Sequence, residues 1–336
     1  MLASKITGIG GHVPNRKVTN FDLEKLLDTT DEWIEQRSGI KQRYWVDAKT
    51  ATSDLALEAS LIAMKNAGIT AQDLDMIIFA TSSPDTDIPG SAAFLQAKLN
   101  RPEIPYFDIR QGCSGFIYGL SLADQYIKTQ FAKCVLVVAA EVQSKGLDLT
   151  PNGRNVSVLF GDGAGAVIVQ ATDVKDITKD AYVMTTHLHA DGTYAKELWM
   201  PGPGSAFGEK RVDQAMLLEG LQYPQMNGRL VFTHAVTRMP QVLIEACTKA
   251  QHPVKDLDMV FFHQANMRIN DKVAEILEIP SEKVHSTIQK FGNTTAATIP
   301  LGMFDAYQEG KLKPGMLIGL AAFGAGFTWS SSILRF

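Results

Sequence analysis

Short apolar runs alternate with amphipathic segments over the first half of the chain. Strands are expected over residues 74–81, 104–109 and 134–140. Helices are expected over residues 53–67, 91–99 and 114–129. Apolar strands that alternate with helices are typical of α/β proteins whose sheets are covered on both faces. The pattern therefore predicts an α/β fold.

The helix expected over residues 53–67 is indicated by spacing and by its end. Leu57, Leu61 and Met64 recur at positions i, i+4 and i+7, which places their side chains on one face of a helix. Gly68 follows where a glycine commonly ends a helix. The spacing thus predicts both the helix and its apolar face.

Similar segments recur in the same order in the two halves of the chain. The sequence DLDMIIF at residues 73–79 returns as DLDMVFF at residues 256–262, an offset of 183 residues, and three further pairs have offsets of 180 to 182 residues. So long a period indicates two fused copies of one unit, because solenoid repeats span about 20–50 residues. Chance similarity among apolar strands is the alternative. We divide the chain into halves at residues 1–172 and 173–336.

The duplication is expected to bring three polar residues together. Cys113 and Asn293 occupy equivalent positions in the two halves, each after a glycine at the expected start of a helix. His263 follows the second-half counterpart of the strand at residues 74–81. Ligands of α/β sheets bind outside the carboxyl ends of the strands. We therefore expect Cys113, His263 and Asn293 to meet at one site.

Composition excludes several classes of protein. Hydrophobic residues make up 45% and charged residues 20% of the 336 residues, as in ordinary globular chains. Lysine and arginine number 32 against 36 aspartates and glutamates, and the net charge of −4 argues against a nucleic-acid binder with a broadly basic surface. Because no apolar stretch approaches 18 residues, no membrane span is expected. Residues 1–15 lack the apolar core of a signal peptide.

The three cysteines bear on the compartment and on the chemistry. They are odd in number and far apart, which favours a reducing cytoplasm over a disulfide scaffold. Cys113 precedes a helix expected to begin near Ser114, and the dipole at a helix N-terminus is expected to lower the pKa of its thiol below about 8.5. We interpret Cys113 as a nucleophile, with a buried structural cysteine as the alternative. Cys134 and Cys247 fit the structural role.

The other polar candidates also have structural alternatives. His263 could be a hydrogen-bonded core histidine, and Asn293 follows a glycine as helix N-caps commonly do. His187 and His189 have the spacing of a strand, but no carboxylate or cysteine cluster accompanies them, so polar contacts are favoured over a metal site. No metal is expected.

Two glycine-rich segments follow apolar strands, GDGAGAV at residues 161–167 and FGAGFTW at residues 323–329. Neither matches the dinucleotide fingerprint or the phosphate-binding P-loop, which leaves a Rossmann dehydrogenase unsupported. We interpret each segment as a tight turn into the next strand. Backbone N–H groups of the second segment could also face a substrate oxygen.

Several motifs, taken together and in this order, resemble one family. They are GCSGF around Cys113, HQANMRI at 263–269, GNTTAATIP at 292–300, FGAGFTW at 323–329, DTTDEWIEQRSGI at 28–40 and FGDGAGA at 160–166. Over its whole length the chain resembles the β-ketoacyl-ACP synthase III family of thiolase-fold condensing enzymes. The resemblance implies a five-layered αβαβα thiolase fold built from two duplicated halves related by a pseudo-twofold axis.

The resemblance also implies a reaction and the residues that perform it. Cys113 would accept an acyl group from acyl-CoA. His263 and Asn293 would bind the thioester carbonyl of malonyl-ACP and stabilise the enolate formed as CO₂ leaves, giving 3-ketoacyl-ACP and initiating fatty acid biosynthesis. The N–H groups of Cys113 and Ala325 would form the oxyanion hole. The remaining implied site residues are Trp33, Arg37, Arg154, Asn266 and Arg268 for CoA and the carrier, and Ile88 and Phe323 for the acyl pocket and its gate.

The implied partners follow from the same resemblance. They are acyl-CoA, acyl carrier protein and a second copy of the chain, with neither nucleic acid nor membrane, in the cytoplasm. The reaction requires no metal or redox cofactor. Family members form homodimers by edge-strand pairing of their N-terminal halves, and the apolar strand at residues 134–140 is compatible with that pairing.

Four departures from the family pattern affect the expected substrates. Ile88 stands where many members carry a larger Phe that caps the acyl pocket of the partner, so a donor longer than acetyl is allowed. Gln111 and Gly112 precede the cysteine where small alanine-like residues are common. Ala325 replaces a glycine but keeps the N–H group. The segment 196–228 is longer than is usual, and loops of this kind carry specificity.

Two other hypotheses remain open beside fatty acid initiation. The same cysteine, histidine and asparagine could transfer an acyl group to oxygen, nitrogen or an acceptor of secondary metabolism. Release of CO₂ from malonyl-ACP distinguishes these reactions. An inactive scaffold that binds a carrier protein is the other alternative, although a scaffold has no need of a thiol at a helix start.

Overall fold

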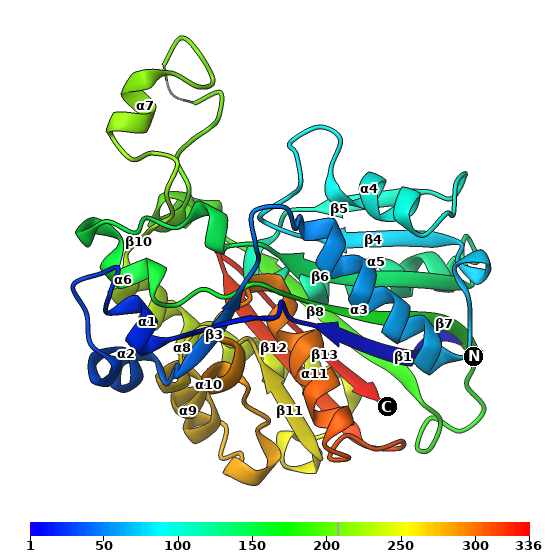
Figure 1. Cartoon of the computed structure of the whole chain (residues 1–336). Helices are drawn as coiled ribbons and strands as arrows, with labels where there is room; N and C mark the ends of the chain where they lie inside the picture. Colours follow the sequence, from blue (N-terminus) through cyan, green and yellow to red (C-terminus); the bar gives the residue numbers. More distant parts are fainter. Residues whose placement is uncertain (207) are drawn as a thin grey trace.

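The chain forms two large sheets flanked by helices (Figure 1), as seen in a computed structural model that describes residues 1–336 except residue 207. The first sheet has the order β1-β7-β6-β4-β5, with β1 Leu2–His12, β4 Met76–Ala80, β5 Tyr106–Ile109, β6 Cys134–Glu141 and β7 Gly163–Asp173. The second has the order β11-β12-β13-β8, with β8 Tyr182–Ala190, β11 Met259–Phe262, β12 Leu317–Gly324 and β13 Thr328–Arg335.

Both sheets mix parallel and antiparallel pairs. In the first, β4 is parallel to β5 and β6, whereas β7 is antiparallel to β1 and β6. In the second, β11 is parallel to β12, and β13 is antiparallel to β8 and β12. Two short pairs complete the strands, β2 Arg16–Thr19 with β3 Gln42–Trp45 and β9 Leu198–Trp199 with β10 Gln225–Met226.

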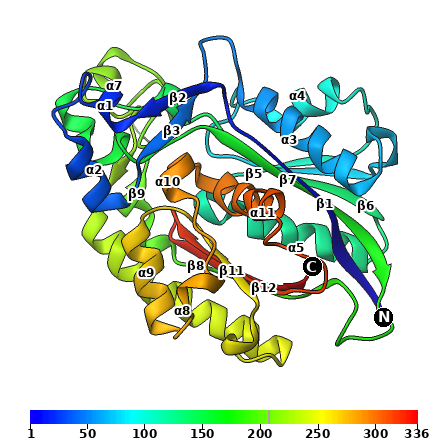
Figure 2. The same ribbon diagram turned by 60° about the horizontal axis from the view of Figure 1, so that its bottom comes forward.

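The helices make three layers around the sheets (Figure 2). Outside the first sheet lie α3 Thr52–Ala67 and α4 Ser91–Lys98, between the sheets lie α5 Gly115–Lys128 and α11 Thr298–Gln308, and outside the second lie α8 Gly228–Ala250 and α9 Met267–Ile276. The shorter helices are α1 Asn20–Leu23, α2 Asp31–Ser38, α6 Arg154–Ser157, α7 Gln214–Leu218 and α10 Ile288–Phe291. The predicted five-layered αβαβα arrangement is confirmed. None of the helices of the described chain is long and apolar enough to cross a membrane.

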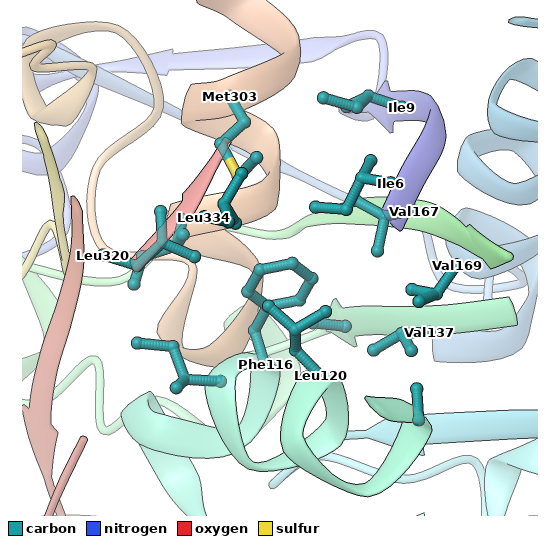
Figure 3. Close-up of a cluster of buried hydrophobic side chains, with 14 of the residues drawn as sticks. Ile6, Ile9, Phe116, Leu120, Val137, Val167, Val169, Met303, Leu320 and Leu334 are labelled. Atoms are coloured by element: carbon teal, nitrogen blue, oxygen red, sulfur yellow. The ribbon is translucent and has the colours of Figure 1, made fainter. Parts of the chain in front are cut away.

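The central core lies between the two sheets (Figure 3). Phe116 and Leu120 on α5 and Met303 on α11 are buried there against apolar side chains of both sheets. The first turns of α5 and α11 are buried in this core, so Cys113, two residues before α5, and Asn293, five residues before α11, are attached to its packed helices. The strands of the first sheet lie within residues 2–173 and those of the second within residues 182–335. The predicted division at residue 172 stays a prediction, and it falls one residue before the end of β7.

The buried face of α3 includes Met64 of the predicted apolar face but not Leu61. Leu61 is 47% exposed, whereas Ala59 and Ala63 are fully buried against β1. A Cβ added at Gly8 or Gly10 of β1 would clash with the carbonyl oxygens of Ala63 and Ala59. Small residues on both elements therefore allow the helix to approach the strand more closely than leucine side chains would permit.

The segment GDGAGAV was predicted as a tight turn into the next strand, and this prediction is wrong for all of it except Gly161 and Asp162, which precede β7. Residues from Gly163 onward belong to the buried strand β7. A Cβ at Gly165 would lie 2.5 Å from the backbone nitrogen of Leu301 in α11. The glycine is needed because α11 packs directly on the strand. The other segment, FGAGFTW, does form the tight connection between β12 and β13.

The edge of the first sheet is also not where the sequence suggested. The apolar strand β6 lies inside the sheet, between β7 and β4, so it is not available for pairing with another chain. The edge strands are β1 and β5, and on β5 Tyr106 and Phe107 are each 39% exposed. An interior position explains the continuous apolar sequence of β6, because both of its faces are covered.

Candidate active site

One cavity of about 1450 Å³ contains most of the predicted site residues. Its wall includes Cys113, His263 and Asn293 from three different segments of the chain. The other predicted residues in its wall are Trp33, Arg37, Asn266, Arg268, Phe323 and Ala325. Arg154 and Ile88 lie outside the wall. The expectation that Cys113, His263 and Asn293 meet at one place is therefore confirmed by the geometry.

Cys113 lies in a 3₁₀ turn, Gly112–Ser114, that leads into α5. Its residue exposure is only 8%. Burial, and secondly the charge of Glu141, raise the pKa of the thiol to about 12, against which the backbone N–H groups of Cys113 and Ala325 act only weakly. The predicted lowering of this pKa by the helix is thus wrong, because desolvation of a buried thiolate outweighs the dipole.

The end of β12 contacts the nucleophile candidate from the other half of the chain. A Cβ added at Gly324 would lie 2.6 Å from the Cβ of Cys113 and 3.0 Å from its Sγ. The backbone N–H group of Ala325 is close enough to act on the sulfur. Two N–H groups, those of Cys113 and Ala325, are therefore present where a carbonyl oxygen bonded at this sulfur would come to lie.

His263 is the first residue after β11 and is 2% exposed. Its Nδ1 lies 2.7 Å from Oγ1 of Thr298, at the start of α11. Its Nε2 is buried and has no hydrogen-bond partner among the described residues. Burial lowers the pKa of the imidazole to about 3, so the ring is neutral at physiological pH. A neutral ring with one unoccupied nitrogen beside a cavity can contact a substrate oxygen.

Asn293 is held by hydrogen bonds of its backbone N–H, its backbone carbonyl and its side chain. Its N–H donates to the carbonyl of Leu159 at 2.9 Å, and its carbonyl accepts from the N–H of Gly161 at 3.0 Å. Its side-chain Oδ1 accepts from the backbone N–H of Thr295 at 2.8 Å. The interpretation of Asn293 as a helix N-cap is not supported, because the caps are Thr294 for the following 3₁₀ turn and Ala297 for α11. With Oδ1 occupied, the amide NH₂ is the end left for a ligand.

Aromatic and basic side chains form the outer part of the site. The guanidinium groups of Arg154 and Arg37 lie 4.4 Å and 5.1 Å from the ring centroid of Trp33 on α2. Asn266 donates to the carbonyl of Arg37 at 2.8 Å, and its Oδ1 accepts from the N–H of Arg268 at the start of α9. Asn266 thus joins α2 to α9.

The residue that sequence reasoning missed is Glu141, the last residue of β6. It is fully buried and accepts hydrogen bonds from the side chains of Ser82, Ser83 and Gln143, all three of which line the cavity. Burial raises the pKa of its carboxyl group, and hydrogen bonds from Ser83 and Ser82 oppose that shift. An acidic residue that ends the apolar run CVLVVAAE was the available signal.

The long segment at residues 196–228 forms an arm that extends away from the body and carries α7 (Figure 1). Its base lines the cavity through Met200 and Met226. Arg211 on the arm pairs with Asp87, which also pairs with Arg110 at 3.6 Å. The arm is therefore attached at its base to the cavity wall and through Arg211 to the loop that carries Ile88.

The histidine pair on β8 makes polar contacts, as expected. His187 and His189 contact the two carboxylate oxygens of Glu245 at 3.0 and 2.6 Å. Within the described residues, one group has the spacing of metal ligands, His285, Asp305 and Glu309. Lys290 already lies 2.8 Å from Asp305 and 2.6 Å from Glu309, so the acidic charge there is paired.

Related sequences cover the whole chain. Residues 107–192 match the family 3-oxoacyl-[acyl-carrier-protein (ACP)] synthase III, and residues 247–336 match its C-terminal region. A β-ketoacyl-[acyl-carrier-protein] synthase III of Xanthomonas campestris pv. campestris is 42% identical over 336 residues, which are 100% of this chain and 99% of the relative. A protein of the same name from Thioalkalivibrio sulfidiphilus is 41% identical over 337 residues, covering 100% of both chains.

Solved structures give the same result. A 3-oxoacyl-[acyl-carrier-protein] synthase III from Aquifex aeolicus has a TM-score of 0.88 and 40% identity, over 99% of this chain and 100% of the other. A β-ketoacyl-[acyl-carrier-protein] synthase III from Thermus thermophilus has a TM-score of 0.88 and 36% identity, over 99% of both chains. This chain is similar to both in sequence and in fold.

Proposed function

The chain belongs to the 3-oxoacyl-[acyl-carrier-protein] synthase III family, and from this membership we propose how its cavity catalyses the reaction. The activity is that of an acyltransferase, a decarboxylative condensation of an acyl-CoA with malonyl-ACP that gives 3-ketoacyl-ACP and initiates fatty acid synthesis. The assignment of roles rests on one observation, the convergence of Cys113, His263 and Asn293 on one cavity.

Cys113 is the proposed nucleophile of the first half-reaction. Its sulfur attacks the thioester carbonyl of acyl-CoA, the bond to the CoA sulfur breaks, and the thiol proton ends on the departing CoA. Covalent capture divides a difficult carbon–carbon bond formation into two easier steps. The N–H groups of Cys113 and Ala325 stabilise the negative oxygen of the tetrahedral intermediate. Because burial raises the pKa of the Cys113 thiol to about 12, the sulfur carries its proton when it meets acyl-CoA.

His263 and Asn293 are the proposed donors of the second half-reaction. Loss of CO₂ from malonyl-ACP places negative charge on the thioester oxygen, and the Nε2–H of His263 and the NH₂ of Asn293 donate to it. Each donor aimed at such an oxygen in a dry site is worth about 3–4 kcal/mol. The enolate carbon then attacks the acyl group on Cys113, and the released thiolate takes up one proton. Every step uses groups of this chain and its substrates, so the scheme needs no metal or redox cofactor.

Acyl-CoA and acyl carrier protein are the proposed partners at the mouth of the cavity. Trp33 and Arg37 are proposed to hold the CoA adenine, and Arg154 is stacked on the indole ring of Trp33. Arginine suits the phosphates of CoA and the acidic surface of a carrier protein because its planar group binds them through two hydrogen bonds. Arg268 on α9 is proposed to bind CoA or the carrier protein in this way. Phe323 is proposed to gate the passage to Cys113.

A second copy of the chain is the remaining proposed partner. The edge strand β5 exposes Tyr106 and Phe107, and Ile88 in the neighbouring loop is 86% exposed, far more than is usual for an isoleucine without a partner. Pairing through β5 would cover all three. Sedimentation should give a dimer for the unchanged chain and a monomer for Phe107→Lys, whereas Ile177→Lys, a change of an equally apolar side chain that is 57% exposed elsewhere, should remain dimeric.

The acyl-enzyme is the direct test of the proposed chemistry. Intact-protein mass spectrometry after incubation with acetyl-, branched or medium-chain acyl-CoA should show one added acyl group. Cys113→Ala should show none, whereas Cys134→Ala and Cys247→Ala should be acylated like the unchanged chain. Retained acylation of Cys113→Ala would exclude the scheme. Release of CO₂ from malonyl-ACP then distinguishes condensation from acyl transfer to oxygen or nitrogen.

A further inference from the structure

The turn between Asn293 and α11 contacts the side chains of both proposed donors. Thr295 begins the 3₁₀ turn Thr295–Ala297, and its N–H donates to Oδ1 of Asn293 at 2.8 Å. Thr298, the first residue of α11, lies with Oγ1 2.7 Å from Nδ1 of His263. Thr295 has a φ of 50°, a left-handed conformation that threonine adopts only under strong constraint. The two donors thus depend on one strained turn.

The hydroxyl of Thr298 has one hydrogen and two nearby hydrogen-bond partners. Its Oγ1 lies 2.7 Å from Nδ1 of His263 and 3.1 Å from the carbonyl oxygen of Thr295. That carbonyl already accepts the backbone N–H of Thr298, so it is satisfied without the hydroxyl. Nδ1, in contrast, has the hydroxyl alone as its partner in the structure as described. Nδ1 accepts from the hydroxyl when the ring hydrogen is on Nε2 and donates to it when the hydrogen is on Nδ1. Because the carbonyl is satisfied in both cases, the shorter contact favours donation of the hydroxyl to the ring.

A neutral imidazole carries one hydrogen, on one of its two nitrogens. His263 is neutral because burial lowers its pKa to about 3. If Nδ1 accepts from Thr298, the single ring hydrogen is on Nε2, which is buried and has no partner among the described residues. The side of the ring next to the cavity then presents a donor rather than a lone pair.

We propose that Thr298 is a positioning residue that fixes His263 in the tautomer carrying its hydrogen on Nε2 and holds that N–H toward the thioester oxygen. The proposal rests on the function given above, since only an enolate oxygen in the second half-reaction requires this donor. Thr298 itself does not touch the substrate, because it is absent from the cavity wall. Its loss should therefore affect decarboxylation and leave acyl transfer to Cys113 nearly unchanged.

The threonine is suited to a matched set of variants. Thr298→Val keeps the shape and removes the hydroxyl, and Thr298→Ser keeps the hydroxyl. Thr294→Val is the control, because Thr294 is equally buried in the same segment, its Oγ1 has no partner among the described residues, and it does not line the cavity. We expect CO₂ release from malonyl-ACP to fall about 10–100-fold in Thr298→Val, as for other displaced catalytic donors. Thr298→Ser and Thr294→Val should stay within about threefold of the unchanged enzyme.

The tautomer itself is measured by ¹⁵N NMR of the full chain labelled at histidine, with the His263 signals assigned by their loss in His263→Gln. The unchanged enzyme should show a protonated Nε2 and an unprotonated Nδ1, and Thr298→Val should show a mixture. A protonated Nδ1 in the unchanged enzyme would overturn the proposal, even if Thr298→Val did not fold. Undiminished CO₂ release by Thr298→Val would also overturn it. If instead the unchanged enzyme neither acylates nor releases CO₂, it is the proposed function that has failed.

Discussion

Gly324 and Cys113 are in contact across the two halves of the chain, so closely that a Cβ on Gly324 would lie 2.6 Å from the Cβ of Cys113. Gly324 is the last residue of β12, and Cys113 lies in the turn that leads into α5. Gly324→Ala should therefore displace the sulfur of Cys113, the proposed nucleophile, from the N–H groups of Cys113 and Ala325. We expect acylation to slow at least about 100-fold, since a shift of 1 Å can have that effect.

The same substitution should reduce stability by about 1–3 kcal/mol, the usual effect of adding a methyl group to a packed interior. Acylation is followed by stopped-flow or quenched mass spectrometry, and stability by urea unfolding. Gly192→Ala is the control, because a Cβ at Gly192 meets no atom within 4 Å. Normal acylation of Gly324→Ala would mean that the backbone around these two residues can shift to accept the methyl group without affecting the chemistry.

Glu141 should control the reactivity of the thiol through its charge. Burial is the largest cause of the raised pKa of Cys113, and the carboxylate of Glu141 is the second. Glu141→Gln removes that charge, so the pKa of the thiol should fall and alkylation by iodoacetamide should begin at lower pH. The alkylation rate of Cys113 is measured between pH 6 and 10 by peptide mass spectrometry. The variant should also lose about 1–3 kcal/mol of stability, because a glutamine places donors among the donor groups of Ser82 and Ser83.

Glu309→Gln is a suitable comparison, since Glu309 lies in the surface network of Lys290 rather than at the cavity. Its alkylation profile should match that of the unchanged chain. A Glu141→Gln profile that moved to higher pH would show that the hydrogen bonds of Glu141 to the cavity wall, rather than its charge, dominate the state of the thiol.

The sequence predicted the layers and the three central residues better than it predicted their environment. Periodicity and duplication identified β4, β6, α3 and α5 within a few residues, because the strands are continuously apolar and the helices are long and periodic. The pKa of Cys113 was predicted in the wrong direction, because the amount of burial and the approach of Glu141 depend on segments far away in the chain. Glycine in β7 was mistaken for a turn residue because the helix that packs on it lies more than a hundred residues later.

The neutral state of His263 should appear as a pH dependence of stability. Burial lowers the pKa of His263 in the folded chain from 6.5 to about 3, whereas the unfolded chain binds a proton near pH 6.5. The contribution of the neutral ring to stability is therefore full above pH 6.5 and is lost as the pH falls toward 3, by up to about 1.4 kcal/mol for each pH unit. Urea unfolding at pH 7, 6 and 5 measures this slope.

In His263→Gln the same series should have a smaller slope, because the group that binds the proton is gone. The comparison of slopes is independent of any constant loss of stability caused by the substitution. Equal slopes for both proteins would mean that His263 takes up its proton in the folded state without penalty. Because His263 stays neutral in the folded chain, its protonation should cause no loss of CO₂ release between pH 8 and 6.

Ile88 should set the length of the acyl donor in the proposed dimer. The side chain is 86% exposed in the single chain and lies outside the cavity wall, so it can influence the donor only by reaching the cavity of a partner. Isoleucine fills less space than phenylalanine, and an added or missing methylene in an apolar pocket changes selectivity by about 10–200-fold. Ile88→Phe should therefore slow acylation by branched or medium-chain acyl-CoA at least about tenfold relative to acetyl-CoA. Intact-mass kinetics with three donors measures the ratio. Leu218→Phe, at an exposed position on the arm, should leave it unchanged. An unchanged ratio in dimeric Ile88→Phe would show that the acyl pocket is closed by residues of its own chain.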